Sequence, residues 1–389
     1  MKKIVLSLLL LTAGAVQHAM AQSDFARGAD VSWCTEMEAD GKHFYNAQGT
    51  ETELMTLMRQ IGMTAVRLRV WVNPETNYGA WSDKADVLAK ARRAKAAGLD
   101  LMIDFHYSNF FADPGNQTKP AEWASYTMEQ LKQAVADHTT DVLSALKEEE
   151  IEPRWVQVGN ETRSGMIWNS GKIDWNKNGK AAWEGYIALS NAGYDAVKSV
   201  LPQAQVIVHI DKGPDDNAWF FQAFKQYGGK FDMIGLSHYP EGSWENENSK
   251  TAANVQTLAT QFNVPVMVVE TGYYCSNETL AAQVMSDFMT KVKGANGCAG
   301  VFYWEPELYG WWKPAYYNKV GWNAYNKGAF TSQGRPAAAL DAFAGEDTKV
   351  QAQSADNAEE QVCYDLNGRR TLPSAHGILV ANGKKRVTK

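Results

Sequence analysis

The sequence predicts an α/β fold, specifically a (β/α)8 TIM barrel with a short C-terminal β-like tail. Between residues 25 and 344, apolar runs with the length of buried strands alternate with amphipathic helical patterns. Apolar strands that are each followed by a helix are typical of a parallel sheet covered by helices. A chain of 389 residues suits one large barrel with an appendage. A doubly wound open sheet is the alternative, but no glycine-rich phosphate turn follows the first strand.

The expected strands and helices alternate in chain order. We expect eight strands, at Gly28–Trp33, Thr64–Val72, Leu99–Tyr107, Trp155–Asn160, Gln205–Asp211, Phe231–His238, Val264–Glu270 and Gly300–Trp304. Helical patterns fall between them, at Asp83–Ala97, Thr127–Glu149, Lys180–Val200, Ala218–Tyr227, Ser249–Phe262 and Glu278–Val292. These units fit a single closed barrel with extra length in some of its loops.

The N-terminus has the pattern of a secretory signal peptide. A basic start at Met1-Lys2-Lys3 precedes an apolar run from Ile4 to Leu11, and Ala19-Met20-Ala21 forms a small-x-small cleavage motif. A membrane anchor is the alternative, but the apolar run is short for spanning a bilayer. We therefore predict that residues 1–21 are removed, that the mature chain has no transmembrane segment, and that the protein is exported to the periplasm, cell surface or medium.

The C-terminal region differs in composition from the predicted barrel, which occupies residues 25–344. Residues 345–361 are polar and acidic and are expected to form a linker. Residues 362–389 contain two Asn-Gly pairs beside β-like runs, which favour a small hairpin element. This tail resembles the end of sorting or anchoring modules on secreted proteins, and a frayed tail is the alternative.

The composition gives no reason to expect nucleic acid as a partner. The net charge is −6, and the Lys and Arg residues are scattered along the chain. The 14 Trp and 16 Tyr residues are numerous; their rings stack on sugar faces, but they also fill cores. Composition alone does not choose between these roles. The sequence does not fix the oligomeric state, and a monomer is the plain expectation.

The four cysteines are far apart and show no metal-ligand spacing. In an oxidising compartment two of them could bridge, and Cys275 and Cys298 are the closest in sequence. The pairing among Cys34, Cys275, Cys298 and Cys363 stays open.

Polar residues stand at the carboxyl end of every predicted strand. In a TIM barrel these ends meet at the face that carries the chemistry. One charged strand end is readily explained as a structural salt bridge, but polar groups at all eight ends are not. The set comprises Asp30 and Ser32, Arg67 and Arg69, Asp104 and His106, Asn160 and Glu161, His209 and Asp211, His238 and Tyr239, Glu270, and Trp304 with Glu305.

Two of these residues, Glu161 and Glu270, have the arrangement that glycoside hydrolysis requires. They end the fourth and seventh strands and lie 270 − 161 = 109 residues apart. Cleavage with retention needs a protonated carboxyl that donates to the leaving oxygen and an ionised one that attacks, about 5–5.5 Å apart. We therefore expect Glu161 to be the acid/base and Glu270 the nucleophile.

The neighbouring residues favour the same chemistry. The Asn160 amide is suited to bind a sugar 2-hydroxyl, and Arg69 and Tyr239 are candidates to keep Glu270 ionised. Taken singly, His106 and His238 are more often structural, and Trp304 is either a sugar platform or core. The candidate substrate-binding residues are Asp30, Arg69, His106, Asn160, His238, Tyr239 and Trp304.

Several motifs, in order, resemble those of glycoside hydrolase family 53, the secreted endo-β-1,4-galactanases. They are Gly28-Ala29-Asp30-Val31-Ser32, Arg67 to Pro74, Asp104 to Ser108, Ala112 to Gly115, Gln117 to Pro120, Val156 to Glu161, Gly235 to Pro240 and Val269 to Tyr273. The resemblance implies a retaining TIM-barrel hydrolase with Glu161 as acid/base and Glu270 as nucleophile. It also implies β-1,4-galactan, as in pectin side chains, as the substrate, and no cofactor.

The chain departs from the family pattern near the predicted cleft. The loop after His106 reads Tyr107-Ser108-Asn109-Phe110-Phe111, where the family usually shows an Asp and a Trp. Asn116 stands where His is common, and the eighth strand continues with Glu305-Pro306-Glu307. Subsite number and product length are therefore open. Some bacterial members hold calcium after the seventh strand, but the stretch from Thr271 to Cys298 is short and lacks an Asp-rich run, so no metal is expected.

Three other functions are weighed against a galactanase. One is a related barrel hydrolase of mannan or xylan. Another is a non-catalytic glycan-binding protein, which would be expected to have lost one carboxylate. A metal-dependent hydrolase is the third, but His106, His209 and His238 fall on three strands and none carries a paired ligand motif.

Overall fold

The computed structural model describes residues 25–74 and 81–345, and four short C-terminal strands within residues 363–388. The predicted signal peptide lies outside the described residues, as does the predicted linker apart from Gly345. Within the described residues, no helix is both long and apolar enough to cross a membrane.

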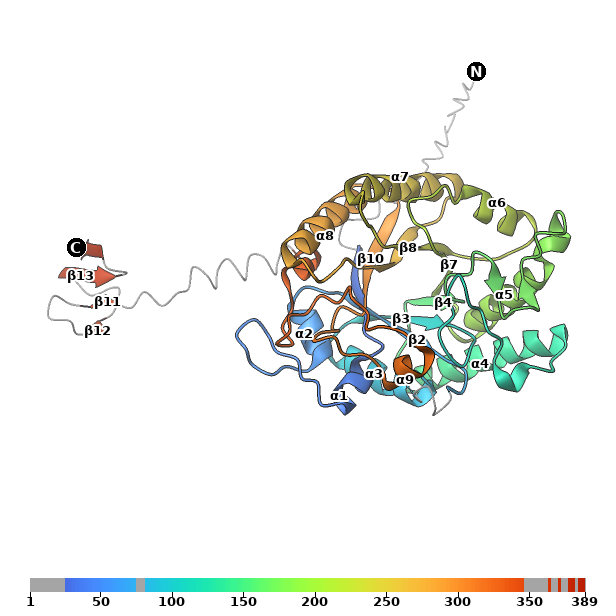
Figure 1. The fold of residues 1–389 in the computed structure, drawn as a ribbon, viewed down its shortest axis with the longest axis horizontal. Helices are drawn as coiled ribbons and strands as arrows, with labels where there is room; N and C mark the ends of the chain where they lie inside the picture. The colour runs from blue at the N-terminus through green and yellow to red at the C-terminus, as the bar shows by residue number, and fades with distance from the viewer. Residues whose placement is uncertain are drawn as a thin grey trace, which may run out of the picture.

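The strands form the predicted (β/α)8 barrel. Eight parallel strands close on themselves in the order β1-β10-β9-β8-β7-β4-β3-β2, and the helices surround them (Figure 1). The strands are β1 (Ala26–Asp30), β2 (Ala65–Val70), β3 (Asp100–Phe105), β4 (Trp155–Val158), β7 (Gln205–Ile210), β8 (Met233–His238), β9 (Val266–Thr271) and β10 (Cys298–Trp304). Each overlaps the range expected from its apolar run.

The six predicted helices are present, and shorter ones are added in the loops. The six are α3 (Lys84–Ala96), α4 (Met128–Glu148), α5 (Lys180–Val200), α6 (Ala218–Gln226), α7 (Trp244–Phe262) and α8 (Glu278–Lys293). The short helices, which the sequence did not predict, are α1 (Cys34–Ala39), α2 (Leu54–Gln60) and α9 (Ala315–Val320). The short two-stranded ribbon β5 (Gly165–Met166) and β6 (Gly171–Lys172) lies in the loop after β4.

Helix α7 begins five residues earlier than predicted. Its first turns are polar, with Glu245 and Glu247 at the end of the helix where negative charge is favourable. Asn248 and Thr251 are buried rather than exposed, because both hydrogen-bond the ring of His238. A prediction from apolar periodicity does not detect these turns, because the side chains that they bury are polar.

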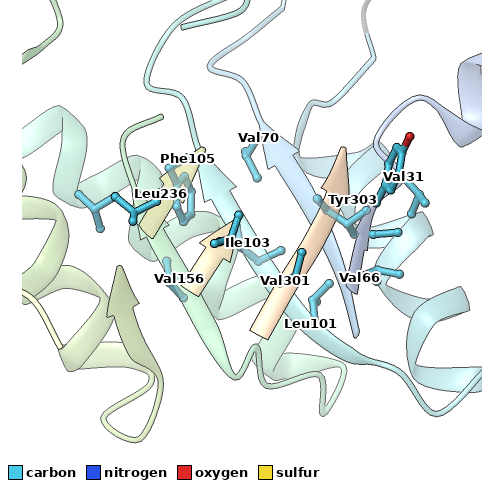
Figure 2. Packing of buried hydrophobic residues seen from close by; sticks show 14 of the residues in the cluster. Val31, Val66, Val70, Leu101, Ile103, Phe105, Val156, Leu236, Val301 and Tyr303 are labelled. Atoms are coloured by element: carbon cyan, nitrogen blue, oxygen red, sulfur yellow. The ribbon is translucent and has the colours of Figure 1, made fainter. Parts of the chain in front are cut away.

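Side chains alternate between the inside and the outside of the barrel. On β2, Val66 and Leu68 belong to the apolar cluster between the strands and the helices, and Figure 2 shows Val66 in this cluster. Ala65 belongs to a separate apolar cluster with residues from other strands, among them Met102, Trp155 and Phe302, that fills the amino end of the barrel. Arg67 and Arg69 follow on the same inner face. The interior thus changes from apolar to charged toward the carboxyl ends of the strands.

Strand β9 breaks this alternation at Glu270. Val269 packs in the apolar interior, so a regular strand would turn Glu270 outward. The pairing with β8 shifts register here, from Leu236 opposite Val268 to Ser237 opposite Glu270. This bulge lets two successive residues face inward, and Glu270 reaches the barrel mouth.

The described C-terminal strands form a small antiparallel sheet, in keeping with the predicted β-like tail. Its order is β12 (Arg370–Thr371), β11 (Cys363–Tyr364), β13 (Gly377–Ala381) and β14 (Lys384–Thr388), with Ala381 opposite Lys384. Cys34, Cys275 and Cys298 are free thiols, so the bridge considered between Cys275 and Cys298 is not formed.

Candidate active site

A cavity of about 290 Å³ opens at the carboxyl ends of the barrel strands, where the sequence places the site. We call it the cleft. Glu161 and Glu270 both face it, from β4 and β9, which are three positions apart around the barrel. The other residues that line it are His106, Phe111, Ala112, Asp113, Asn160, Tyr239, Trp304, Tyr317, Trp322, Tyr325 and Lys327.

Glu161 is presented by a sharp turn at the end of β4. Gly159 has a φ of 85° and Glu161 itself a φ of 47°, both in the left-handed region. A side chain at position 159 would place its Cβ 2.6 Å from Cγ2 of Thr162. Left-handed backbone is costly for a non-glycine residue, and such strain is characteristic of functional sites.

Glu161 is half-buried, and none of the described cations pairs with it. The Ser237 hydroxyl donates to its Oε1 at 2.7 Å, and Nε2 of His209 lies 2.8 Å from the Ser237 oxygen. Burial, reinforced by the nearby charge of Glu270, raises the pKa of Glu161 well above its usual value, and the Ser237 hydrogen bond only partly opposes this. Glu161 is thus the carboxyl that retains its proton.

Glu270 has the opposite surroundings. Nη2 of Arg67 lies 2.9 Å from its Oε1, and the Tyr239 hydroxyl donates to Oε2 at 3.0 Å. Burial raises the pKa of Glu270 to about 7, while Arg67 and Tyr239 both act to lower it. Of the two carboxyls, Glu270 is therefore the one that ionises first.

The cation beside Glu270 is Arg67, and the expectation that Arg69 fills this role is wrong. Arg67 is the centre of a buried network that also holds Asp30 at 2.7 Å and Asp104 at 2.8 Å. Asp30 is completely buried and does not line the cleft, so it orients Arg67 instead of contacting a ligand directly.

Arg69 lies one inner position further along β2 and is directed elsewhere. It pairs with Glu305, and its guanidinium lies 4.8 Å from the Phe111 ring centroid and about as close to Trp33 and Trp71. Arg69 is buried and does not line the cleft.

Glu305 and Glu307 are the departures from the family pattern that follow β10, and both are fully buried. The Trp33 backbone N–H donates to Glu305 at 3.1 Å. No N–H group and no hydroxyl donates to either side-chain oxygen of Glu307, and its hydrogen-bond partner is the Glu305 carboxyl. Burial and the adjacent charge of Glu305 raise the pKa of Glu307 well above its usual value.

Asn160 and His106 line the cleft as predicted, and the protein fixes their orientation. Oδ1 of Asn160 accepts from Arg67 at 2.8 Å, and its Nδ2 donates to the Ala112 carbonyl at 2.8 Å. A side-chain amide has two N–H groups, so one is left for a ligand. His106 lies 2.9 Å from Asp104 through Nε2 and accepts the Ala112 N–H through Nδ1 at 2.9 Å.

His238 does not reach the cleft, contrary to its predicted role in substrate binding. It alternates with Ser237 on β8 and faces the helices, where it contacts Asn248 at 2.7 Å, Thr251 at 3.0 Å and the ring of Phe288. Burial lowers its pKa to about 4, so the ring is neutral. It is a structural histidine that joins β8 to α7 and α8.

Trp304 lies at the cleft within an aromatic wall supplied largely by the loop after β10. Its ring meets Tyr325 edge-to-face at 4.6 Å, and Tyr317 and Trp322 continue the wall. Lys327 completes it, with Nζ 4.2 Å from the Tyr274 ring centroid. Amphipathic rings on one side and carboxyls on the other make a cleft suited to a polyhydroxylated ligand.

Ser237 and His209 were not assigned roles from the sequence, although both bear on Glu161. His209 stands at the end of a predicted strand, and burial lowers its pKa well below the ordinary value. The signal for Ser237 was its position one residue before His238 on a strand whose inner face ends at the cleft. Among the described residues, no group of three or more His, Cys, Asp or Glu is arranged to hold a metal ion.

Comparison with known proteins assigns the chain to one family. The model of glycosyl hydrolase family 53 matches residues 26–343. An arabinogalactan endo-β-1,4-galactanase of Cellvibrio japonicus is 32% identical over 333 residues, which cover 78% of this chain and 86% of that protein. The protein of the same name from Thermothelomyces thermophilus is 32% identical over 72% of this chain and 89% of its own.

Solved structures agree. A fungal β-1,4-galactanase superposes with a TM-score of 0.69 at 29% identity, covering 81% of this chain and 98% of that one. The family 53 catalytic domain of Ignisphaera aggregans gives a TM-score of 0.71 at 27% identity, covering 82% and 95%. A family 10 endoxylanase, with a TM-score of 0.57 at 12% identity, shares the fold alone.

Proposed function

Because this chain belongs to glycosyl hydrolase family 53, we propose that it cleaves β-1,4-galactan within the chain, with retention, using Glu161 and Glu270. The observation that carries the proposal is the contrast between the surroundings of two carboxyls at one cleft. Glu270 has a cation and a phenol to hold it ionised, and Glu161 has neither. A donor and a nucleophile need these two states.

In the first step, Glu270 attacks the anomeric carbon while Glu161 gives its proton to the departing glycosidic oxygen. The bond from the anomeric carbon to that oxygen breaks, and a glycosyl ester forms on Glu270. Tyr239 and Arg67 then hold an ester in place of a carboxylate. Loss of the Glu270 charge lowers the pKa of Glu161, whose proton has left, so it is ready to act as a base.

In the second step, Glu161 takes a proton from water, which attacks the anomeric carbon and releases Glu270. The sugar leaves with its original configuration after two inversions. Asn160, with one free N–H at the cleft, is placed to bind a sugar hydroxyl, and Trp304 offers a ring for the sugar face.

Galactan as the substrate rests on the relatives named as arabinogalactan endo-β-1,4-galactanases. Hydrolysis of mannan or xylan is the alternative, since barrel hydrolases of such glycans share the fold. The test is release of reducing ends from linear β-1,4-galactan, β-mannan and xylan in parallel. Selective cleavage of galactan supports the proposal. Selective cleavage of mannan or xylan would contradict the proposed substrate but not the proposed catalytic mechanism.

The same assay tests the catalytic pair. Glu161→Gln and Glu270→Gln should each lower kcat/KM on galactan by about a thousandfold or more, because each removes a group used in bond breaking. Glu241→Gln is the matched control. Glu241 is an exposed glutamate that contacts Tyr274 and does not line the cleft. Full activity in either cleft variant would contradict the assignment.

We also propose that the protein is exported and acts as a monomer. The N-terminal pattern supports export, and a soluble polymer is best reached outside the cell. N-terminal sequencing of the mature protein should begin at Gln22, and sedimentation should give the mass of one chain. A retained Met1, or a stable dimer, would contradict these points.

A further inference from the structure

Tryptophan is exposed only on the catalytic face of this protein, within the part of the chain that the structure describes. Four tryptophans are exposed, and all lie in segments that follow the carboxyl ends of barrel strands. Trp311 and Trp322 come from the loop after β10, and Trp322 lines the cleft. Trp175 and Trp219 do not line the cleft, and the mechanism proposed above does not use them.

Trp175 and Trp219 form a pair from two different loops. Their ring centroids are 6.0 Å apart, and they are 56% and 44% exposed. Trp175 precedes α5 in the loop after β4, and Trp219 is the second residue of α6, after β7. Large exposed apolar patches mark interaction sites more often than chance allows, and two adjacent indoles are such a patch.

The pair stands on a rigid base. Trp175 contacts the buried Trp183, and Trp219 contacts the buried Phe220, while Trp183 and Phe220 pack together at 5.2 Å. The turn that carries Trp175 is tied to α5 by the Asp174 N–H, which donates to the Ala182 carbonyl. Rings held this way lose little conformational freedom when a ligand binds.

The pair is also joined to the acid/base end of the cleft. Arg163, two residues beyond Glu161, donates to Asp211 at 2.6 Å and to Asn217 at 2.9 Å. Asn217 is the residue immediately before α6, next to Ala218 and Trp219. One guanidinium thus fixes the segment that carries Glu161 relative to the helix that carries Trp219.

The position around the barrel indicates which part of a substrate the pair would meet. In the closed strand order, β4 lies directly opposite β10, four strands away in either direction. Trp304 and the aromatic wall come from the β10 side, where the sugar that becomes attached to Glu270 would stack. Glu161, on β4, gives its proton to the departing oxygen, so the leaving part of the chain extends over the β4 and β7 loops.

We propose that Trp175 and Trp219 form a second galactan-binding surface, which holds galactosyl units on the leaving-group side beyond the cleft. The ligand is a neutral galactan chain, because the apolar face of a galactosyl ring stacks on an exposed indole. The proposal rests on the function proposed above and extends it, since that function needs only the sugars within the cleft. It explains why a soluble protein leaves two adjacent indoles in water.

The test compares a long substrate with one that has no leaving chain. The substrates are linear galactan and a nitrophenyl β-1,4-galactobioside, whose leaving group is a single phenol. Replacing both residues, Trp175→Ala with Trp219→Ala, should lower kcat/KM on galactan about tenfold, the effect of losing one good stacking contact. Activity on the nitrophenyl substrate and the melting temperature should stay unchanged, because both rings are exposed.

Two further variants sharpen the comparison. Trp175→Phe with Trp219→Phe keeps aromatic faces and should restore most of the activity on galactan. Trp311→Ala removes an equally exposed indole from the β10 side, so any loss should affect both substrates alike. Galactan activity that survives the double alanine change, or a parallel loss on both substrates, would overturn the proposal. A native protein that cleaves neither substrate would instead overturn the proposed function and the surface with it.

Discussion

Two glutamates with the same chemistry differ here because of three neighbouring side chains. Glu270 lies against Arg67 and Tyr239, and Glu161 meets only the Ser237 hydroxyl. Desolvation raises the pKa of both carboxyls, and the neighbours decide which one ionises first. The profile of kcat/KM against pH should therefore be bell-shaped, with Glu270 governing the acidic limb and Glu161 the basic limb.

Replacing Ser237 with alanine should shift the basic limb alone. The Ser237 hydroxyl stabilises the ionised form of Glu161, so its loss raises the pKa of that carboxyl further and moves the limb to higher pH. The rate at the optimum should fall about tenfold as the acid loses its orienting contact. The measurement is kcat/KM from about pH 4 to about pH 10 on a soluble galacto-oligosaccharide.

Replacing Tyr239 with phenylalanine should shift the opposite limb. The phenol stabilises the ionised form of Glu270, so its loss raises the pKa of that carboxyl and moves the acidic limb to higher pH. The rate should fall about tenfold to a hundredfold, as expected for a lost hydrogen bond to a charged group. If Tyr239→Phe moved the basic limb, or Ser237→Ala the acidic one, the two assignments would have to be exchanged.

The sequence identified both carboxyls but not all of their partners. Arg67 and Arg69 share one face of β2, and local pattern gives no means to tell them apart. The distinction comes from residues distant in sequence: Asp104 holds Arg67 from β3, and Glu305 holds Arg69 across the seam between β1 and β10. His238 was misplaced for a simpler reason, since it follows Ser237 and alternation turns it outward.

At the scale of elements, the turn after β4 places Glu161. Gly159→Ala should lower stability by about 1–3 kcal/mol and lower kcat/KM at least about tenfold, because a side chain there is strained by its φ of 85° and collides with Thr162. Thermal unfolding and kinetics measured together test this.

Gly41→Ala is the matched control for that change. Gly41 has a similar φ of 75°, but an added Cβ would have no neighbour within 4 Å. This variant should lose some stability and keep its activity. Equal activity in Gly159→Ala and Gly41→Ala would show that the turn does not position Glu161.

Most barrel elements were predictable because their signals are local. Helical periodicity predicted the six long helices. The predicted ends of α5 are exact, and those of the other five lie within two residues of the observed ends, except at the start of α7. The bulge on β9 was not predictable, because it arises from the register shift against β8 and not from any residue that marks it. Glu270 therefore faces the cleft because of a bulge that the sequence of β9 alone does not predict.

At the scale of the whole molecule, a group of buried acids ties the first and last strands together. Glu305 follows β10, accepts the Trp33 N–H that follows β1, and pairs with Arg69 on β2. Glu307 lies beside it, and burial, the charge of Glu305 and a hydrogen bond to Glu305 raise the pKa of Glu307, so folding keeps it protonated. A carboxyl that binds its proton more tightly when folded makes stability fall as pH rises above its unfolded pKa of about 4.3.

Glu307→Gln should remove this loss of folding stability at higher pH. The variant should match the native protein near pH 4 and become more stable relative to it as pH rises, by up to about 1.4 kcal/mol per pH unit until the folded pKa is reached. Urea unfolding at about pH 4, 6 and 8 measures the difference in unfolding free energy between the variant and the native protein. A constant difference at all three would show that Glu307 is ionised in the folded protein.

The most direct test of the account is to trap the intermediate. A 2-deoxy-2-fluoro-galactosyl substrate with a good leaving group should inactivate the enzyme by forming a stable ester, because the fluorine slows the second step. Peptide mass spectrometry should find one fluorogalactosyl group on Glu270. A label on Glu161 would reverse the two roles, and no label, with the sugar released in inverted configuration, would contradict the double displacement.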